Sequence, residues 1–147
     1  MKMARQIVVA ATMVSLLPAS GFAATCPDSP PLDMRGTRGA ILNPNGAPVV
    51  SGQIKLYGAR QVSPNTYRKS SEKAAATAMT DNQGAFDLSS VEAGVYFMTL
   101  TQKGSAARTV LVRLPPRNSV MMPKQKEVWL KLSPDECVGM MVYVPNQ

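Results

Sequence analysis

The chain has 147 residues, of which 45% are hydrophobic, and a formal net charge of +7, with no histidine. This length suits one domain with a single core. The lack of histidine removes the commonest general base at neutral pH and the commonest zinc ligand, so the composition argues against most hydrolytic and zinc-dependent mechanisms.

The N-terminal segment has the pattern of a secretory signal peptide. Lys2 and Arg5 precede an apolar stretch at residues 7–17, and small residues follow it, as signal peptidase requires. The stretch is shorter than the about 20 residues that span a bilayer. We therefore expect residues 1–24 to be cleaved. The product would be periplasmic or secreted, without stable membrane insertion, and its net charge would be about +5.

The chain contains two cysteines, Cys26 and Cys137. In an exported chain a disulfide between them is the default expectation. It would close a loop of about 110 residues and, in the chain-entropy model, restrict the unfolded state by roughly 4 to 5 kcal/mol. The alternative is lipidation of Cys26, although Thr25 directly before it is a poor match to a lipoprotein signal.

Residues 25–35 are expected to form an extended arm, because Pro27, Pro30 and Pro31 interrupt regular structure. Beyond the arm, β-type runs alternate with turn signals at roughly the 8 to 12 residue spacing of sandwiches and barrels. No segment has a sustained helical period. The sequence predicts an all-β fold, an antiparallel β-sandwich of seven to eight strands, with a long loop at residues 58–73. The expected strands are residues 39–42, 52–57, 74–80, 85–88, 95–101, 108–114, 127–132 and 139–144.

Alternation along these strands predicts the core. Successive side chains of a strand point to opposite faces, so apolar residues two apart share a face. The residues expected to face inward are Ile54, Leu56, Phe86, Leu88, Tyr96, Met98, Leu100, Val110, Val112, Leu114, Val128, Leu130 and Leu132.

Five short motifs occur in an order that resembles the carboxypeptidase regulatory-like domain. They are GTRGAI at 36–41, NGAPV at 45–49, QIKL at 53–56, TDNQGAF at 80–86 and AGVY at 93–96. The resemblance covers residues 36–114, and the family belongs to the transthyretin-like and collagen-adhesin B-type sandwiches. It implies a single transthyretin-like (prealbumin-like) domain over residues 36–147. It implies no catalytic residues, because carboxypeptidase activity in that family resides in a separate domain.

No catalytic or metal-binding constellation stands out in the sequence. Asp135 and Glu136 are an adjacent carboxylate pair in a stretch that favours a loop. The methionine pairs 121–122 and 140–141 contain thioethers that suit copper(I), but neighbours on a strand point to opposite faces. We therefore expect no metal and no cofactor.

The sequence favours a non-enzymatic module with a binding or structural role in the bacterial cell envelope. The partner would be an envelope protein or a polysaccharide, contacted through Tyr57, Tyr67, Arg68 and Lys69 in and beside the long loop. The basic residues are scattered, so we expect no nucleic-acid partner. The alternative is a small hydrolase with an unrecognised pocket.

Overall fold

The fold is described from a computed structural model for residues 28–116, 127–135 and 137–143. Residues 1–24 and Cys26, on which the predicted export signal and half of the predicted disulfide depend, lie outside this range. No helix long and apolar enough to cross a membrane occurs among the described residues. Their strands are β1 (Leu32–Asp33), β2 (Arg38–Leu42), β3 (Gln53–Ser63), β4 (Thr66–Lys69), β5 (Ala76–Met79), β6 (Ala85–Asp87), β7 (Gly94–Thr101), β8 (Arg108–Leu114), β9 (Val128–Leu132) and β10 (Met140–Val142).

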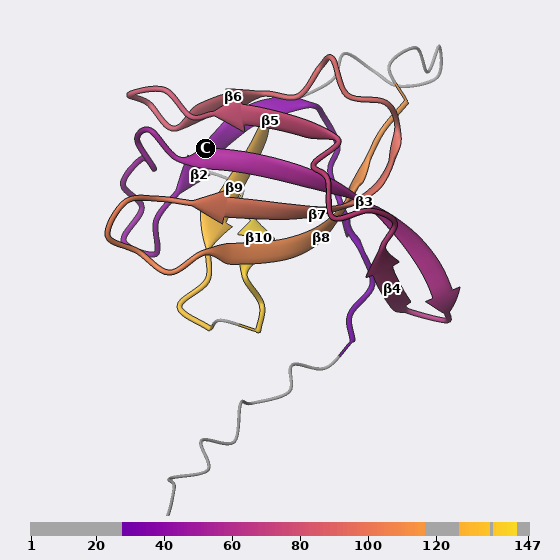
Figure 1. The fold of residues 1–147 in the computed structure, drawn as a ribbon. Helices are drawn as coiled ribbons and strands as arrows, with labels where there is room; N and C mark the ends of the chain where they lie inside the picture. Colours follow the sequence, from indigo (N-terminus) through magenta and orange to yellow (C-terminus); the bar gives the residue numbers. More distant parts are fainter. Residues whose placement is uncertain (1–27, 117–126, 136, 144–147) are drawn as a thin grey trace, which may run out of the picture.

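The strands form two sheets, as the ribbon in Figure 1 shows. The large sheet has the order β1-β8-β7-β3-β4, with β5 also paired to β3, and the small sheet has the order β10-β9-β2-β6. Buried side chains from both sheets make one hydrophobic cluster. The predicted all-β class is therefore confirmed, and the arrangement is that of a β-sandwich.

The expectation of a purely antiparallel sandwich is wrong, because both sheets are mixed. β1 pairs with β8 in parallel, and β2 pairs with β9 in parallel. Antiparallel neighbours can be joined by a tight turn, whereas parallel neighbours need a long connection. The chain between β2 and β9 runs through β3, β4, β5, β7 and β8 of the large sheet and β6 of the small one, so no hairpin dictates their direction. Alternation of apolar residues carries no information on strand direction.

The described residues contain ten strands, more than the predicted seven to eight, for two reasons. Residues 32–33 of the arm pair with β8, although the arm was expected to lack regular structure. The expected loop at residues 58–73 contains the second half of β3 and all of β4, which form a hairpin. Asn65 in its turn has a φ of 60°, a left-handed conformation that asparagine tolerates well. The Pro64-Asn65 pair therefore marks a hairpin turn within the expected loop.

Every predicted core residue is buried or partly buried, and the observed core also contains Met34, Ile41, Val49, Val91 and Met140, which were not predicted. Phe86, Leu88, Val112, Leu114 and Leu130 are buried, as alternation required. The remaining predicted core residues are either buried (Ile54, Leu56, Met98, Leu100 and Val128) or packed against the core as partly buried side chains (Tyr96, Val110 and Leu132).

Gly39 allows the close approach of β9 to β2. A Cβ atom at this position would overlap the carbonyl oxygen of Val128, its partner in the parallel ladder. Backbone atoms of a central strand cannot move aside cheaply, so a larger residue would push the strands apart. The small sheet therefore depends on glycine here.

Thr80 links the end of β5 to the segment before β3. Its side chain is buried, and Oγ1 accepts a hydrogen bond from the Gly52 amide at 2.8 Å and donates one to the Val49 carbonyl at 2.6 Å. The chain just after β5 is thus tied to the segment that leads into β3. Both backbone groups would lose their partner without the hydroxyl.

We predict that Thr80→Val lowers the free energy of unfolding by about 2 to 4 kcal/mol, because a buried amide and a buried carbonyl are left unpaired. Urea unfolding of the mature protein measures this as a lower midpoint at unchanged slope. The matched control is Thr77→Val on the exposed side of β5, expected within about 0.5 kcal/mol of the wild type. Equal midpoints for the two variants would contradict the role of Thr80.

Candidate binding site

The β3-β4 hairpin extends the large sheet beyond the sandwich. β3 pairs with β7 from Gln53 to Gly58, and after Gly58 its remaining residues pair with β4 alone. In Figure 1 this hairpin projects from the lower right of the body. Because the second sheet does not cover it, side chains of the hairpin are available at the surface.

An apolar row crosses the outer face of the large sheet next to this hairpin. Tyr57 of β3 lies opposite Phe97 of β7, which lies opposite Leu111 of β8. All three are partly buried. They alternate with inward-facing residues such as Leu56 and Met98, so they belong to the face away from the core.

A hollow of about 230 Å³ lies at this row. Phe97 and Leu111 of the sheet line it, together with Asn65 and Tyr67 of the hairpin and Ser29 of the arm. Its lining also includes Val110 and, from the connection between β9 and β10, Val138, so the hollow extends beyond the outer face of the large sheet. The arm and hairpin are also joined directly, because Thr66 Oγ1 donates a hydrogen bond of 3.0 Å to Asp28 Oδ2. The hollow is therefore a shallow site with aromatic walls and several polar groups.

The structure brings three of the four predicted binding residues to one face. Tyr67 pairs with Gln61 and Lys69 pairs with Ala59, which places both on the face of Tyr57. The Lys69 ammonium lies 4.1 Å from the centre of the Tyr57 ring, a cation–π contact. Arg68 pairs with Arg60 and belongs to the opposite face of the hairpin.

Phe97 and Leu111 are site residues that the sequence reading missed. Each lies between core positions on its strand, and such positions on a solvent-facing sheet are usually polar. An aromatic ring and a leucine at outward positions of neighbouring strands were therefore a detectable signal. Finding it required the pairing of β7 with β8, which joins the two residues into one row.

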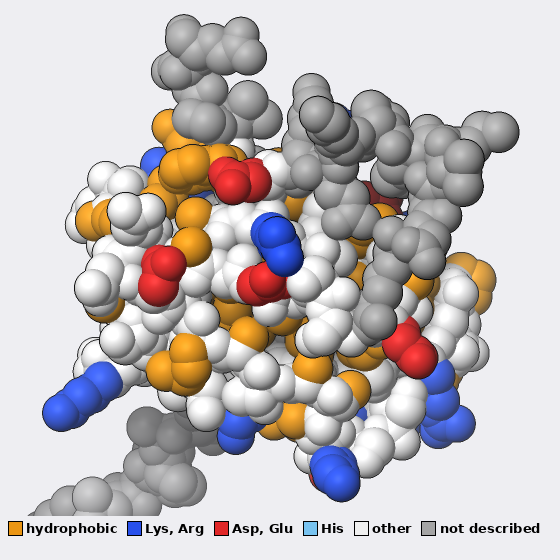
Figure 2. Space-filling view, turned by 90° about the horizontal axis from the view of Figure 1, so that it is seen from above, with side chains coloured by type: hydrophobic (Ala, Val, Ile, Leu, Met, Phe, Trp, Pro, Cys, Tyr) orange, Lys and Arg blue, Asp and Glu red, His pale blue; other side chains and the backbone are white. Residues whose placement is uncertain are grey.

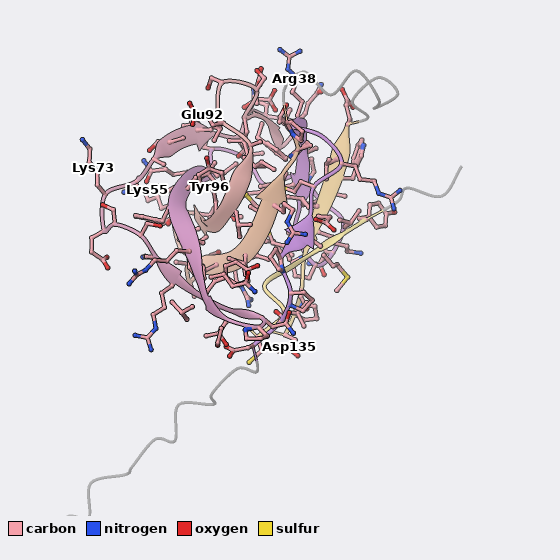
Figure 3. All side chains as sticks on the ribbon, turned by 90° about the vertical axis from the view of Figure 1, so that its right-hand side faces the viewer. Arg38, Lys55, Lys73, Glu92, Tyr96 and Asp135 are labelled. Carbon is pink, nitrogen blue, oxygen red and sulfur yellow. The ribbon has the colours of Figure 1, made fainter. Side chains whose placement is uncertain are left out.

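Of the adjacent carboxylate pair considered for catalysis, Asp135 is described and Glu136 lies outside the described residues. Asp87 is held by Ser89, whose side chain and backbone amide lower the pKa of the carboxyl, and Arg38 lies 3.0 Å away. Figure 3 shows Arg38 and Asp135 at opposite ends of the molecule. Among the described residues no cluster of three metal-ligating side chains occurs.

Cys137 is also at the hollow. It lines the same space as Asp28 and Ser29, and its backbone amide donates to Asp135 Oδ1 at 2.9 Å. Cys26 precedes Asp28 by two positions, a length of chain that spans at most about 7 Å. The start of the described arm is thus close enough to Cys137 to suit the predicted disulfide, which stays a prediction because Cys26 is not described.

Comparison with known proteins gives no identity. No protein-family model matches the chain, and no curated protein matches it. The resemblance to the carboxypeptidase regulatory-like domain therefore depends on the motifs alone.

We predict that peptide mapping of the mature protein without reductant recovers Cys26 and Cys137 in one disulfide-linked pair. Cys137→Ser should then lower the free energy of unfolding by about 2 to 5 kcal/mol, because the unfolded chain loses its cross-link. Reduction of the wild type should give the same loss, whereas reduction of the variant should change nothing. Recovery of Cys26 as a lipid-modified residue would contradict the pairing.

Proposed function

We propose that this protein is an exported β-sandwich module that binds an envelope polysaccharide at the outer face of its large sheet, without catalysis. The observation that carries the proposal is the hollow lined by Phe97 and Tyr67, where aromatic rings and polar groups meet. Export is supported by the signal-peptide pattern of residues 1–24. Assignment to the transthyretin-like sandwiches is part of the same proposal.

The chemistry of the hollow suits a sugar unit. An aromatic ring presents an apolar face, and tyrosine adds a hydroxyl at its tip, so one side chain can contact both the C–H and O–H groups of a sugar. Asn65, Ser29 and Thr109 add polar groups at the rim. A volume of about 230 Å³ is small for an extended organic ligand and adequate for one ring of a longer chain.

The positions of the site residues also favour binding. Phe97 and Leu111 are fixed by ladders on central strands, while Tyr67 and Asn65 come from the hairpin. Binding residues are often carried by projecting segments that a rigid scaffold positions, as the sheet positions this hairpin. Lys69 beside Tyr57 adds a positive charge, and its only ion-pair partner in the described chain, the largely exposed Glu72 at 4.0 Å, leaves it accessible to an anionic sugar.

The charge distribution offers less support for a nucleic-acid partner. On the face shown in Figure 2, Lys and Arg side chains are scattered among Asp and Glu, without a large basic area. Binding to a phosphate backbone draws on clustered Lys and Arg side chains. The site residues instead combine three aromatic rings with one lysine.

The alternative of a small hydrolase has weaker support. Glycoside hydrolysis commonly uses two carboxylates on either side of the bond. Asp28 lines the hollow, and its Oδ2 is occupied by the hydroxyl of Thr66. Asp33 and Asp135 line an adjoining hollow of about 610 Å³, where Asp33 is paired with Arg113 and Asp135 accepts from the Cys137 amide. With all three carboxylates engaged by neighbours, the arrangement favours binding over cleavage.

We predict that Tyr67→Ala weakens binding of isolated envelope polysaccharide by about 10-fold or more, because a ring at the centre of the site is lost. The measurement is isothermal titration of the mature protein, with variants checked for folding by circular dichroism. Arg68→Ala, one residue away on the opposite face, is the control and should bind within about twofold of the wild type.

Three results would overturn the proposal. If Arg68→Ala loses binding and Tyr67→Ala retains it, the site is on the other face of the hairpin. If the wild type binds no polysaccharide and instead forms a defined complex with a purified envelope protein, the ligand class is wrong. Release of reducing sugar during the titration would favour the hydrolase alternative.

A further inference from the structure

Arg108 occupies an unusual place at the start of β8. It alternates with Val110 and Val112, so its side chain begins on the inward face of the large sheet. Its Nη1 atom is buried and has no hydrogen-bond partner within the described part of the chain. Buried polar atoms are almost always paired, so an unpaired guanidinium nitrogen indicates a missing acceptor.

A hollow of about 200 Å³ adjoins Arg108. Leu100 and Leu132 form apolar walls from the two sheets, and Asn43, Gln102 and Ser105 add polar groups from the connecting turns. No described Asp or Glu is among its lining residues. The positive charge of Arg108 therefore faces this space without a neighbouring carboxylate.

Hydrogen bonds within its own turn leave the side chain of Asn43 with only donor groups for the hollow. Its Oδ1 accepts from the backbone amides of Asn45 and Ala47, at 3.0 and 2.9 Å. The side-chain oxygen is thus committed to the turn after β2, and the amide NH₂ that remains can only donate. The hollow consequently combines this donor with the guanidinium, while the hydroxyl of Ser105 is able to donate as well.

We propose that this hollow is a binding site for a small oxyanion, a carboxylate or a phosphate group, held by Arg108. A guanidinium paired with an anionic oxygen makes one of the strongest hydrogen bonds in proteins. The volume of the hollow accommodates such a group. The site is built from the ends of β2, β7, β8 and β9 and does not depend on the outer-face site, because the two hollows share no lining residue.

Water is the competing occupant. One water takes up about 30 Å³ of liquid, so several waters fit in the hollow and one of them could accept from Nη1. An oxyanion differs from water in a measurable way, because its binding saturates and depends on the charge of Arg108.

The test is a titration of the ¹⁵N-labelled mature protein with sodium phosphate and, separately, sodium acetate, at constant ionic strength set by sodium chloride. We expect saturable shifts of the Gln102 and Ser105 amides and of the Arg108 Nε signal. Arg108→Gln should lower the affinity for the tighter-binding of the two anions by about 10-fold or more. Arg60→Gln removes the same charge from the exposed hairpin and should bind within about twofold of the wild type. Tighter binding of acetate would indicate a carboxylated ligand, and tighter binding of phosphate a phosphorylated one.

Shifts that rise linearly and never saturate, or equal shifts in Arg108→Gln and Arg60→Gln, would show an adventitious ion only and overturn the proposed site. If Arg108→Gln does not fold, Arg108→Lys decides, since it keeps the charge and loses the planar fork. Weaker binding of the preferred anion by the lysine variant supports the proposal, and unchanged binding overturns the role of the guanidinium. Either result is separable from the polysaccharide titration, because Tyr67→Ala leaves this hollow intact.

Discussion

The parallel pairing of β9 with β2 is the constraint on which the rest of the structure depends. β2 is a central strand of the small sheet, and without β9 that sheet would consist of β2 and the three-residue β6. β9 and β10 supply Val128, Leu130 and Met140, which complete the cluster between the sheets. Gly39 permits the contact, because any Cβ there would overlap the Val128 carbonyl oxygen. The C-terminal part of the chain therefore closes a core that the earlier strands begin.

The large sheet packs its inner face against the small sheet and leaves its outer face for other contacts. Its inner face is fully covered, as the 0% exposure of Ile54, Met98 and Val112 shows. No strand of the described residues covers its outer face, which carries the partly buried row of Tyr57, Phe97 and Leu111. Single apolar side chains at a surface are common, whereas contiguous apolar areas mark interaction surfaces. The β3-β4 hairpin, joined to the arm through Thr66 and Asp28, borders this row.

Local patterns were enough to predict the positions of eight of the ten described strands and most of the side chains they bury, because alternation records burial directly. They were not enough for strand direction, since parallel and antiparallel neighbours of β2 would show the same alternation. The β3-β4 hairpin was missed because its residues are mostly exposed, and strands without a buried face lack an apolar pattern. For the same reason Arg68 was grouped with Tyr67 and Lys69, although register places it on the other face. Arg108 could be assigned to a strand from sequence, but its buried nitrogen and the hollow beside it emerge only when β2, β7 and β9 meet.

The most direct test of this account is a nuclear Overhauser spectrum of the mature protein that reports contacts between β2 and β9. The parallel register pairs Gly39 with Val128 and Ile41 with Leu130. The account predicts interstrand cross-peaks between backbone protons that advance in the same direction along both strands. Cross-peaks that run in opposite directions, or none between these strands in a folded sample, would contradict it.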